Sequence, residues 1–363
     1  MKWSWKLGRF AGIDVYIHAT FLLLIGFVGF SYWQQEKTYS AVLSGIGFIL
    51  ALFLCVVLHE YGHALTARRY GITTRDITLY PIGGVARLER MPDDPRQELR
   101  VALAGPAVNV LIAAVLLAWL FFTGALPSVA SLSVTSGTFL ERLMLVNATL
   151  ALFNLIPAFP MDGGRVLRAL LATRLEYTQA THIAAVIGQG VAVVFGFIGL
   201  FSNPFLVFIA LFVWIGAEQE ASMVRMKTSL GGIPVSRAMV TEFHTLEASH
   251  PLSRAVEYIL VGSQHDFPVL DGGQVVGILT RQDLMKALAQ RGEDFPVSSI
   301  MSREFRSVDS YDMLESAFAS MQACQCHTMP VTHAGQLVGL LTMENVGEFL
   351  AIQAALKPSR AHA

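Results

Sequence analysis

The sequence predicts a polytopic α-helical membrane protein, with six transmembrane helices and a short membrane-associated β-hairpin, followed by a soluble α/β tandem pair of domains. Three observations predict this fold class. Of the 363 residues, 53% are hydrophobic and only 15% are charged, which is too apolar for a soluble globular protein. Long apolar segments fill the chain as far as Ala217, and a tandem repeat begins after Lys227. We therefore expect domains at 1–227, 228–295 and 296–355.

Each apolar segment is predicted to form one membrane-spanning helix, because about 20 apolar residues cross the hydrocarbon core. The segments are Ile17–Trp33, Ala41–Ala67, Val101–Thr123, Phe139–Phe159, Ala180–Phe201 and Pro204–Ala217. Basic residues gather before the first segment and after the second, fourth and sixth, whereas the alternate connections hold only Lys37 and Arg142. This asymmetry predicts a multi-pass protein of the plasma or inner membrane with both termini in the cytoplasm.

His59 and His63 stand on one face of the second predicted helix, because four residues make about one turn. With this spacing two imidazoles bind one Zn²⁺, and Glu60 beside them serves as general base. Residues 41–58 before them carry no charge, so polar groups at this depth are costly unless they bind something. A pair of helix-packing histidines would not explain the glutamate between them. We predict a metal site with Glu60 as the catalytic residue.

A third metal ligand must come from the same depth. Asp162 lies at the inward-running end of the fourth segment, in a stretch interrupted by Pro157 and Pro160. Broken helix ends at membrane depth are tolerated where they line a cavity or a site. We therefore expect Asp162 to join His59 and His63, the alternative being an exposed aspartate in an ordinary turn.

Other residues near this depth have two interpretations. Asn109 and Asn154 are amides in apolar helices, and either hydrogen bonding between helices or contact with substrate, including an oxyanion, accounts for them. Between the second and third segments, strand-forming residues interrupted by Gly83 and Gly84 predict the hairpin. His18, near the inner edge of the first segment, is interpreted as a packing or interfacial residue rather than a ligand.

Together these motifs resemble the site-2 protease family of intramembrane zinc metalloproteases, most of all its six-span prokaryotic members with cytoplasmic CBS domains. The motifs are His59-Glu60-x-x-His63, Gly105-Pro-x-x-Asn109, the Gly83-Gly84 hairpin and a spaced Asn154…Pro157…Asp162-Gly163. The resemblance implies a zinc metalloendopeptidase with one Zn²⁺ per chain that cleaves transmembrane segments in regulated intramembrane proteolysis. The implied substrates are single-span proteins such as anti-sigma factors or membrane-tethered regulators.

The soluble part repeats with an offset of 62 residues, so that Ser236–Met239 recurs as Ser298–Met301 and His265–Thr280 as His327–Thr342. The two repeats resemble a pair of CBS domains, and the resemblance implies regulation of the protease.

CBS pairs often bind adenine nucleotides such as ATP or AMP. The resemblance assigns Thr280 and Asp283 to the ribose, with Thr342 as the counterpart of Thr280. Asn345 stands where the second repeat would have its acid. A purely structural pair that joins two chains as a homodimer is the alternative.

The remaining features of the sequence give no support for nucleic-acid binding or for a disulfide framework, and they leave one alternative function, a metal transporter. A net charge of −1, with no basic run interleaved with aromatic residues, gives no case for nucleic acid. Cys55 in a span and Cys324 and Cys326 in the soluble part predict no disulfide framework. A nucleotide-regulated metal transporter would also place histidines in the membrane, but it needs no general base, so Glu60 favours the protease.

Overall fold

A computed structural model of the chain describes residues 3–356, apart from 82, 90, 93, 126–136, 263 and 325. The chain divides into two compact units, Met1–Val224 and Arg225–Ala363. Each unit has its own hydrophobic cores, and each is described by itself below.

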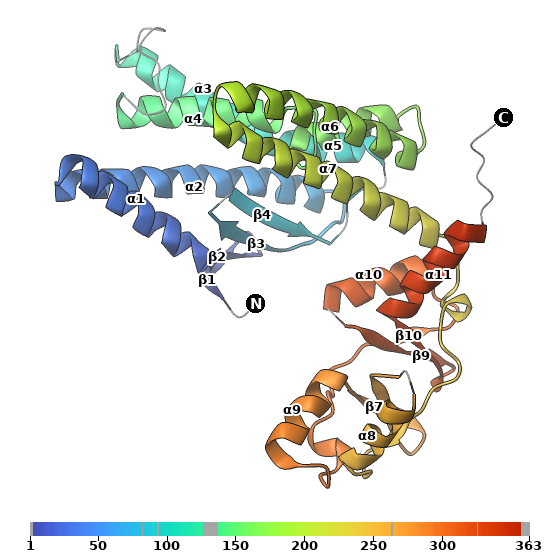
Figure 1. Ribbon diagram of the computed structural model, residues 1–363. Coiled ribbons are helices and arrows are strands. Elements are labelled where there is room, and N and C mark those ends of the chain that lie inside the picture. The colour runs from blue at the N-terminus through green and yellow to red at the C-terminus, as the bar shows by residue number, and fades with distance from the viewer. Residues whose placement is uncertain are drawn as a thin grey trace. The chain divides into compact units, whose positions relative to one another are not determined.

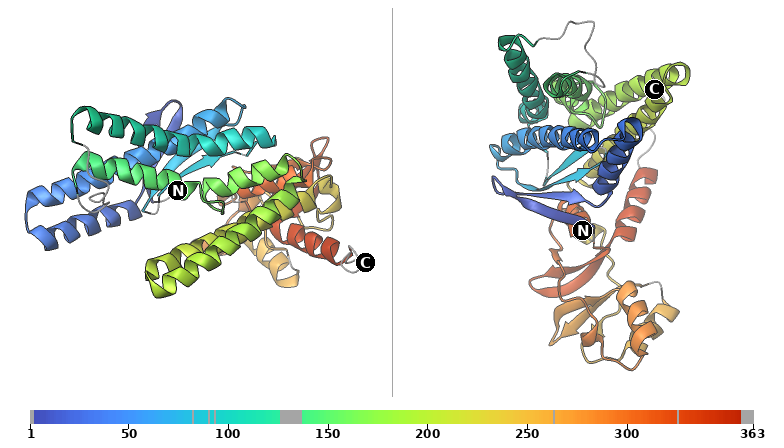
Figure 2. Two further views of the ribbon diagram at one scale, coloured as in Figure 1. Left: turned by 90° about the horizontal axis from the view of Figure 1, so that it is seen from above. Right: turned by 90° about the vertical axis from the view of Figure 1, so that its left-hand side faces the viewer.

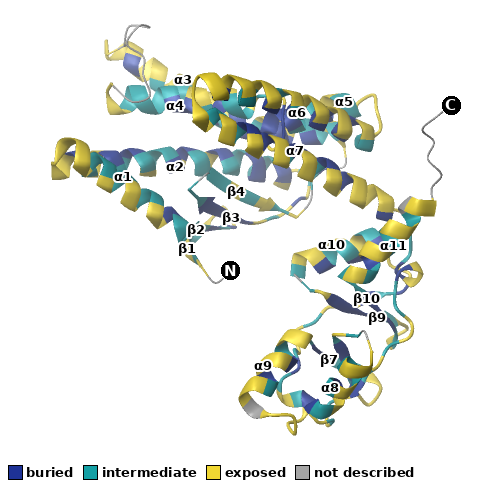
Figure 3. Cartoon of the chain, viewed as in Figure 1, coloured by how far each residue is buried: buried dark blue, intermediate teal, exposed yellow. Residues whose placement is uncertain are grey.

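Helices make up most of the first unit (Figure 1). They are α1 (Thr20–Glu36), α2 (Tyr39–Arg68), α3 (Pro95–Phe122), α4 (Phe139–Asn154), α5 (Asp162–Ala172), α6 (Tyr177–Phe201) and α7 (Pro204–Leu230). By length and composition, α2, α3, α6 and α7 could cross a membrane. Exposed residues cover much of α6 and α7 (Figure 3), among them large apolar side chains such as Phe197 and Phe208. So much exposed apolar surface indicates that lipid covers it.

The other two predicted spans form shorter helices, and two predicted boundaries were wrong. α1 and α4 have 17 and 16 residues, or roughly 25 Å at 1.5 Å per residue, against a hydrocarbon core of about 30 Å. Ile17 lies in a strand rather than in the first helix. α4 ends at Asn154 rather than at Phe159, because Pro157 and Pro160 interrupt the helical hydrogen bonds.

A four-stranded sheet completes the first unit, in the order β1-β2-β3-β4. Its strands are β1 (Ser4–Phe10), β2 (Ile13–His18), β3 (Thr74–Tyr80) and β4 (Gly83–Leu88). β3 and β4 pair antiparallel, with Tyr80 opposite Gly83. The sequence did not predict β1 and β2, and the parallel pairing of β2 with β3 puts Asp14 opposite Asp76. The sheet packs against α2 through β3 and β4 (Figure 2), and β4 forms one edge of the sheet.

Helices α2 and α3 approach each other closely because Gly62 has no side chain at their contact. A Cβ atom at Gly62 would lie 2.6 Å from the backbone oxygen of Ala104. Only glycine therefore permits this spacing. The face of α3 that turns toward α2 carries Val101, Gly105 and Asn109.

The second unit contains the two sequence repeats. The first repeat has β5 (Leu246–Glu247), α8 (Leu252–Val261), β6 (Phe267–Asp271), β7 (Gln274–Leu279) and α9 (Arg281–Arg291). The second has β8 (Val308–Asp309), α10 (Leu314–Cys324), β9 (Thr328–His333), β10 (Gln336–Thr342) and α11 (Met343–Leu356). The offset of 62 residues holds in the structure, since α8 begins at Leu252 and α10 at Leu314. Each repeat forms its own three-stranded sheet.

The segment that precedes each repeat packs into the core of the other repeat. Val235 is buried with Leu314 and Met321 of the second repeat, and Val297 is buried with Leu252 of the first. Backbone hydrogen bonds follow the same exchange: residue 240 pairs with residue 340, and residue 302 with residue 278. Val297 and Met301, which follow the expected boundary at residues 295 and 296, therefore help to complete the hydrophobic core of the first repeat.

Cys324 and Cys326 form a disulfide, which the sequence did not predict. The two Cα atoms lie 5.2 Å apart, within the range that a disulfide spans. Cys55 is a free, buried cysteine of α2.

Candidate active site

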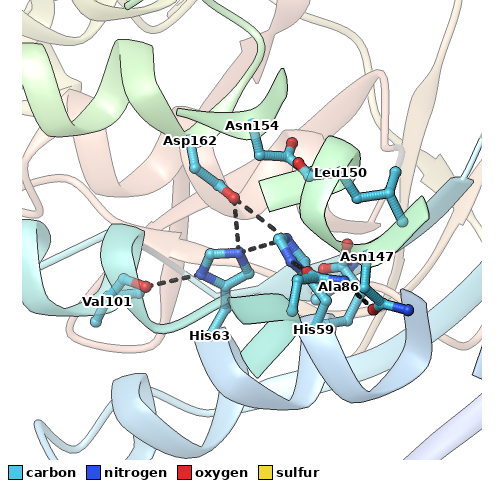
Figure 4. Close-up of polar contacts among 10 residues, drawn as sticks. His59, His63, Ala86, Val101, Asn147, Leu150, Asn154 and Asp162 are labelled. Atoms are coloured by element: carbon cyan, nitrogen blue, oxygen red, sulfur yellow. Dashed lines mark hydrogen bonds and ion pairs between the residues drawn. The ribbon is translucent and has the colours of Figure 1, made fainter. Parts of the chain in front are cut away.

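The structure brings His59, His63 and Asp162 together (Figure 4). The two Nε2 atoms of the histidines, one turn apart on α2, lie 3.1 Å from each other. Asp162, the first residue of α5, places Oδ2 3.1 Å from Nε2 of His63 and 3.2 Å from Nε2 of His59. All three residues are buried. The three side chains therefore turn one atom each toward a common point.

The other nitrogen of each imidazole is held by α3. Nδ1 of His59 lies 2.5 Å from Oδ1 of Asn109, and Nδ1 of His63 lies 2.7 Å from the backbone oxygen of Val101. Because both acceptors are oxygens, each Nδ1 carries the proton and each Nε2 keeps its lone pair free. Such hydrogen bonds fix the orientation of metal-binding histidines.

Asn109 is oriented in turn by Asn147 of α4. The Nδ2 of Asn109 donates to Oδ1 of Asn147 at 2.9 Å, and both side chains are fully buried. Asn147 was not predicted from the sequence, although it is an amide within an apolar helix, which is the same signal that pointed to Asn109. The hydrogen bonds of Asn109 match the interhelical alternative left open by the sequence.

The three donors fit a zinc ion. Two imidazole nitrogens and one carboxylate oxygen are ligands that Zn²⁺ prefers, and three protein ligands leave a fourth position for water. The three donor atoms lie within 4.8 Å of one another. Gly105 leaves the space in front of them open, since a Cβ atom at this position would collide with Nε2 of His63 and lie 2.7 Å from Nε2 of His59.

Glu60 faces strand β4. Its Oε2 accepts a hydrogen bond from the backbone N–H of Ala86 at 3.2 Å. A Cβ atom at Gly84 would lie 2.9 Å from Cγ of Glu60, so glycine lets the edge strand reach the carboxylate. The predicted hairpin and the predicted base are therefore neighbours in the structure.

The turn before α5 sets the position of Asp162. Cβ atoms at Gly163 and Gly164 would collide with the backbone of residues 155–159, so only glycine allows α5 to begin so close to the end of α4. Asn154 lies in this region and donates from Nδ2 to the backbone oxygen of Leu150 at 3.0 Å (Figure 4). His18 lies apart from the site: Nδ1 is 2.8 Å from the hydroxyl of Thr20 and the ring packs near Tyr80.

In the second unit, Thr280, Asp283 and Thr342 line one cavity of about 1070 Å³. Thr280 donates to the Asp283 carboxylate at 2.7 Å, and Thr342 donates to Oδ1 of Asn345 at 2.5 Å. Each threonine also accepts a hydrogen bond from the first turn of the following helix, so these residues cap helices as well as line the cavity.

Comparisons with known proteins agree with the family resemblance stated above for each of the two parts of the chain. The profile of Peptidase family M50 matches residues 47–136 and 127–196, and the CBS domain profile matches residues 235–290 and 297–351. Zinc metalloprotease MJ0392 of Methanocaldococcus jannaschii is 34% identical over 327 residues, which cover 87% of this chain and 92% of the relative.

Two further similarities are partial. Stage IV sporulation protein FB of Bacillus subtilis is 29% identical over 136 residues, covering 37% of this chain and 44% of that protein. The solved structure of the site-2 protease from Methanocaldococcus jannaschii is 38% identical and covers 60% of this chain and 95% of its own, with a TM-score of 0.44.

Proposed function

The chain belongs to peptidase family M50, the site-2 proteases, and is a zinc metalloprotease with tandem CBS domains, and we propose that it cleaves transmembrane segments of single-span membrane proteins. The observation that carries the proposal is the buried cluster of His59, His63 and Asp162, with Glu60 in the turn between the two histidines. The family assignment confirms the resemblance seen in the sequence, and it does not favour the metal transporter.

In the proposed mechanism, His59, His63 and Asp162 hold one Zn²⁺ per chain. When bound, zinc polarises the scissile carbonyl and makes its bound water more acidic. Glu60 takes the proton from the attacking water on its carboxylate and returns it to the leaving amine. Asn109 keeps the imidazole of His59 oriented. Asn154 is the remaining candidate for contact with the substrate or its oxyanion.

Strand β4 is the proposed binding site for the unwound substrate. A transmembrane helix hides its carbonyl groups in hydrogen bonds between residues i and i−4, so it must unwind before attack. β4 lies at the edge of its sheet and beside Glu60. Pairing with this edge would satisfy the unwound backbone in a lipid environment and bring it to the base.

We propose six spans, with α1 and α4 accompanying the four longer helices, in the plasma or inner membrane. α1 and α4 are both short enough to need local thinning of the bilayer. The asymmetry of basic residues supports cytoplasmic termini. Anti-sigma factors and other membrane-tethered regulators are the proposed substrates, because they are single-span proteins released by such cleavage.

The CBS pair is the proposed regulator, and an adenine nucleotide such as ATP or AMP is its proposed ligand. The cavity lined by Thr280, Asp283 and Thr342 is large enough for a nucleotide. α7 connects the CBS pair covalently to the protease. The helix ends at Leu230, which is buried in the hydrophobic core of the second repeat. A CBS pair that only joins two chains would bind no nucleotide.

The test of the proposed function is cleavage of a single-span protein by the full chain in detergent, with Glu60→Gln and a metal chelator as the two controls. We expect cleavage to disappear in both, with zinc still bound by Glu60→Gln. Activity that survives Glu60→Gln would contradict the proposed base. Zinc transport into liposomes without any cleavage would instead support a transporter.

A further inference from the structure

Arg168 of α5 is a charged side chain in the interior of the first unit, with a side-chain exposure of 1%. Its Nε and Nη2 donate to Oε1 of Glu98 on α3, at 2.8 and 2.5 Å. Its Nη1 donates to Oε1 of Glu220 on α7 at 2.5 Å. One guanidinium group therefore ties α5 to two other helices.

Two aromatic rings enclose the same guanidinium. The ring centres of Phe159 and Tyr177 lie 5.1 and 5.0 Å from Cζ of Arg168, within range of a cation–π interaction. Phe159 belongs to the turn before α5, and Tyr177 begins α6. The planar fork of arginine can bind two carboxylates and pack between rings at once, whereas a lysine would offer a single point charge.

These contacts bear on the metal site because Asp162 begins the same short helix. α5 has 11 residues, and Arg168 lies six residues, or about 9 Å along the helix axis, from Asp162. Arg168 therefore touches none of the metal donors itself. Its partner Glu98 stands on α3, the helix that also orients both imidazoles through Val101 and Asn109.

We propose that Arg168 is a positioning residue of the metal site: held by Glu98 and Glu220, it fixes α5 so that Asp162 meets the Nε2 atoms of His59 and His63. The inference rests on the proposed role of Asp162 as a metal ligand. Without Arg168 the three donors remain in the chain, but the third one is no longer held in register with the other two. Metal affinity then falls because the site must be reassembled each time a metal binds.

The experiment measures zinc affinity of the full chain in detergent, by competition with a chromophoric chelator, and the visible absorption spectrum of the Co²⁺-loaded protein. The variants are Arg168→Met and Arg168→Lys. The matched control is Arg174→Met, which removes an exposed arginine just beyond α5. We expect zinc to bind at least ~10-fold more weakly to Arg168→Met, the usual scale for partners that orient metal ligands. The zinc affinity of Arg168→Lys should lie between those of the parent and of Arg168→Met, and its Co²⁺ spectrum should be altered. The control Arg174→Met should have the zinc affinity and the Co²⁺ spectrum of the parent.

Thermal unfolding of the metal-free proteins separates positioning from stability. If the Arg168 variants unfold at lower temperature yet keep the parent zinc affinity and Co²⁺ spectrum, the positioning role is overturned. Should Arg168→Met not fold, Glu220→Gln replaces it, because this change leaves the Arg168–Glu98 pair intact. A smaller loss of zinc affinity is then expected, and parent-like affinity overturns the inference.

Asp162→Asn, measured in parallel, tests the proposed ligand set independently. Parent-like zinc affinity of Asp162→Asn would overturn the role of Asp162 and with it the premise of the inference. Weak binding by Asp162→Asn together with parent-like Arg168 variants would overturn the positioning role alone.

Discussion

Gly105 of α3 lies against the imidazole of His63, with no room between them for a side-chain carbon. The open space at the three donor atoms is therefore created by the absence of a side chain on a neighbouring helix. α3 contributes no ligand, yet it decides how close its backbone can come to the site and how both histidines are oriented.

Replacing Gly105 by alanine should disrupt the metal site. The added methyl group would overlap Nε2 of His63 and crowd Nε2 of His59, so the rings must rotate away from Asp162. We expect zinc affinity to fall by roughly tenfold or more, measured by chelator competition. Gly190→Ala in α6, where a Cβ atom would meet nothing within 4 Å, is the control. Equal zinc binding by both variants would show that the site can relax around the methyl group.

Replacing Asn109 should weaken zinc binding more than replacing Asn147, because Asn109 contacts His59 directly and Asn147 contacts only Asn109. Asn109→Leu removes the amide oxygen that accepts the hydrogen bond from Nδ1 of His59 and frees the imidazole ring to turn. Zinc affinity should therefore drop by about 10- to 100-fold. Asn147→Leu leaves Asn109 in place but takes away its acceptor, and a smaller loss is expected. The measurement is zinc affinity at constant pH. A larger effect of Asn147→Leu than of Asn109→Leu would contradict this order.

Val85→Pro tests whether β4 presents the substrate to Glu60. Proline cannot donate a backbone hydrogen bond and is poorly accommodated in a paired strand, and Val85 pairs with Thr78 of β3. We expect cleavage of a single-span substrate to fall at least ~10-fold while zinc binding persists. Val85→Thr, which keeps the N–H group and the branched side chain, should retain activity. Unchanged cleavage by Val85→Pro would rule out strand pairing at this edge.

Asp283→Ala should weaken binding of AMP or ATP to the full chain, because its carboxylate lines the cavity beside Thr280. A tenfold loss is expected on the scale of a lost charged hydrogen bond of about 1.4 kcal/mol or more, measured by calorimetry. Asp271→Ala, at an exposed strand end, is the control. If neither nucleotide binds the parent chain, the CBS pair does not sense adenine nucleotides.

Local patterns in the sequence were enough to locate the candidate site. The spacing of His59 and His63 depends only on the helical repeat, and the apolar residues around them already indicate a membrane helix. The 62-residue repeat likewise needs only self-comparison of the chain. Asp162 could be added because the orientation of successive spans places two helix ends at one depth.

Contacts between distant segments were beyond the reach of the sequence. β1 and β2 are short, and most residues of β1 are exposed. β2 is joined to the sheet by pairing with β3, some sixty residues later. The packing of Val235 and Val297 into the core of the other repeat also leaves no signal in the local sequence. An apolar valine is compatible with burial in either core.

The sequence by itself determined the kinds of chemical group in the site and the helix that carries two of them, because both follow from residue type and helical spacing. The tertiary structure alone decided what surrounds those groups: the amide pair behind His59, the missing side chain at Gly105, and the anchoring of α5 by Arg168 between Glu98 and Glu220. Each of these depends on helices meeting at a particular distance and rotation, which is set by packing across the whole unit.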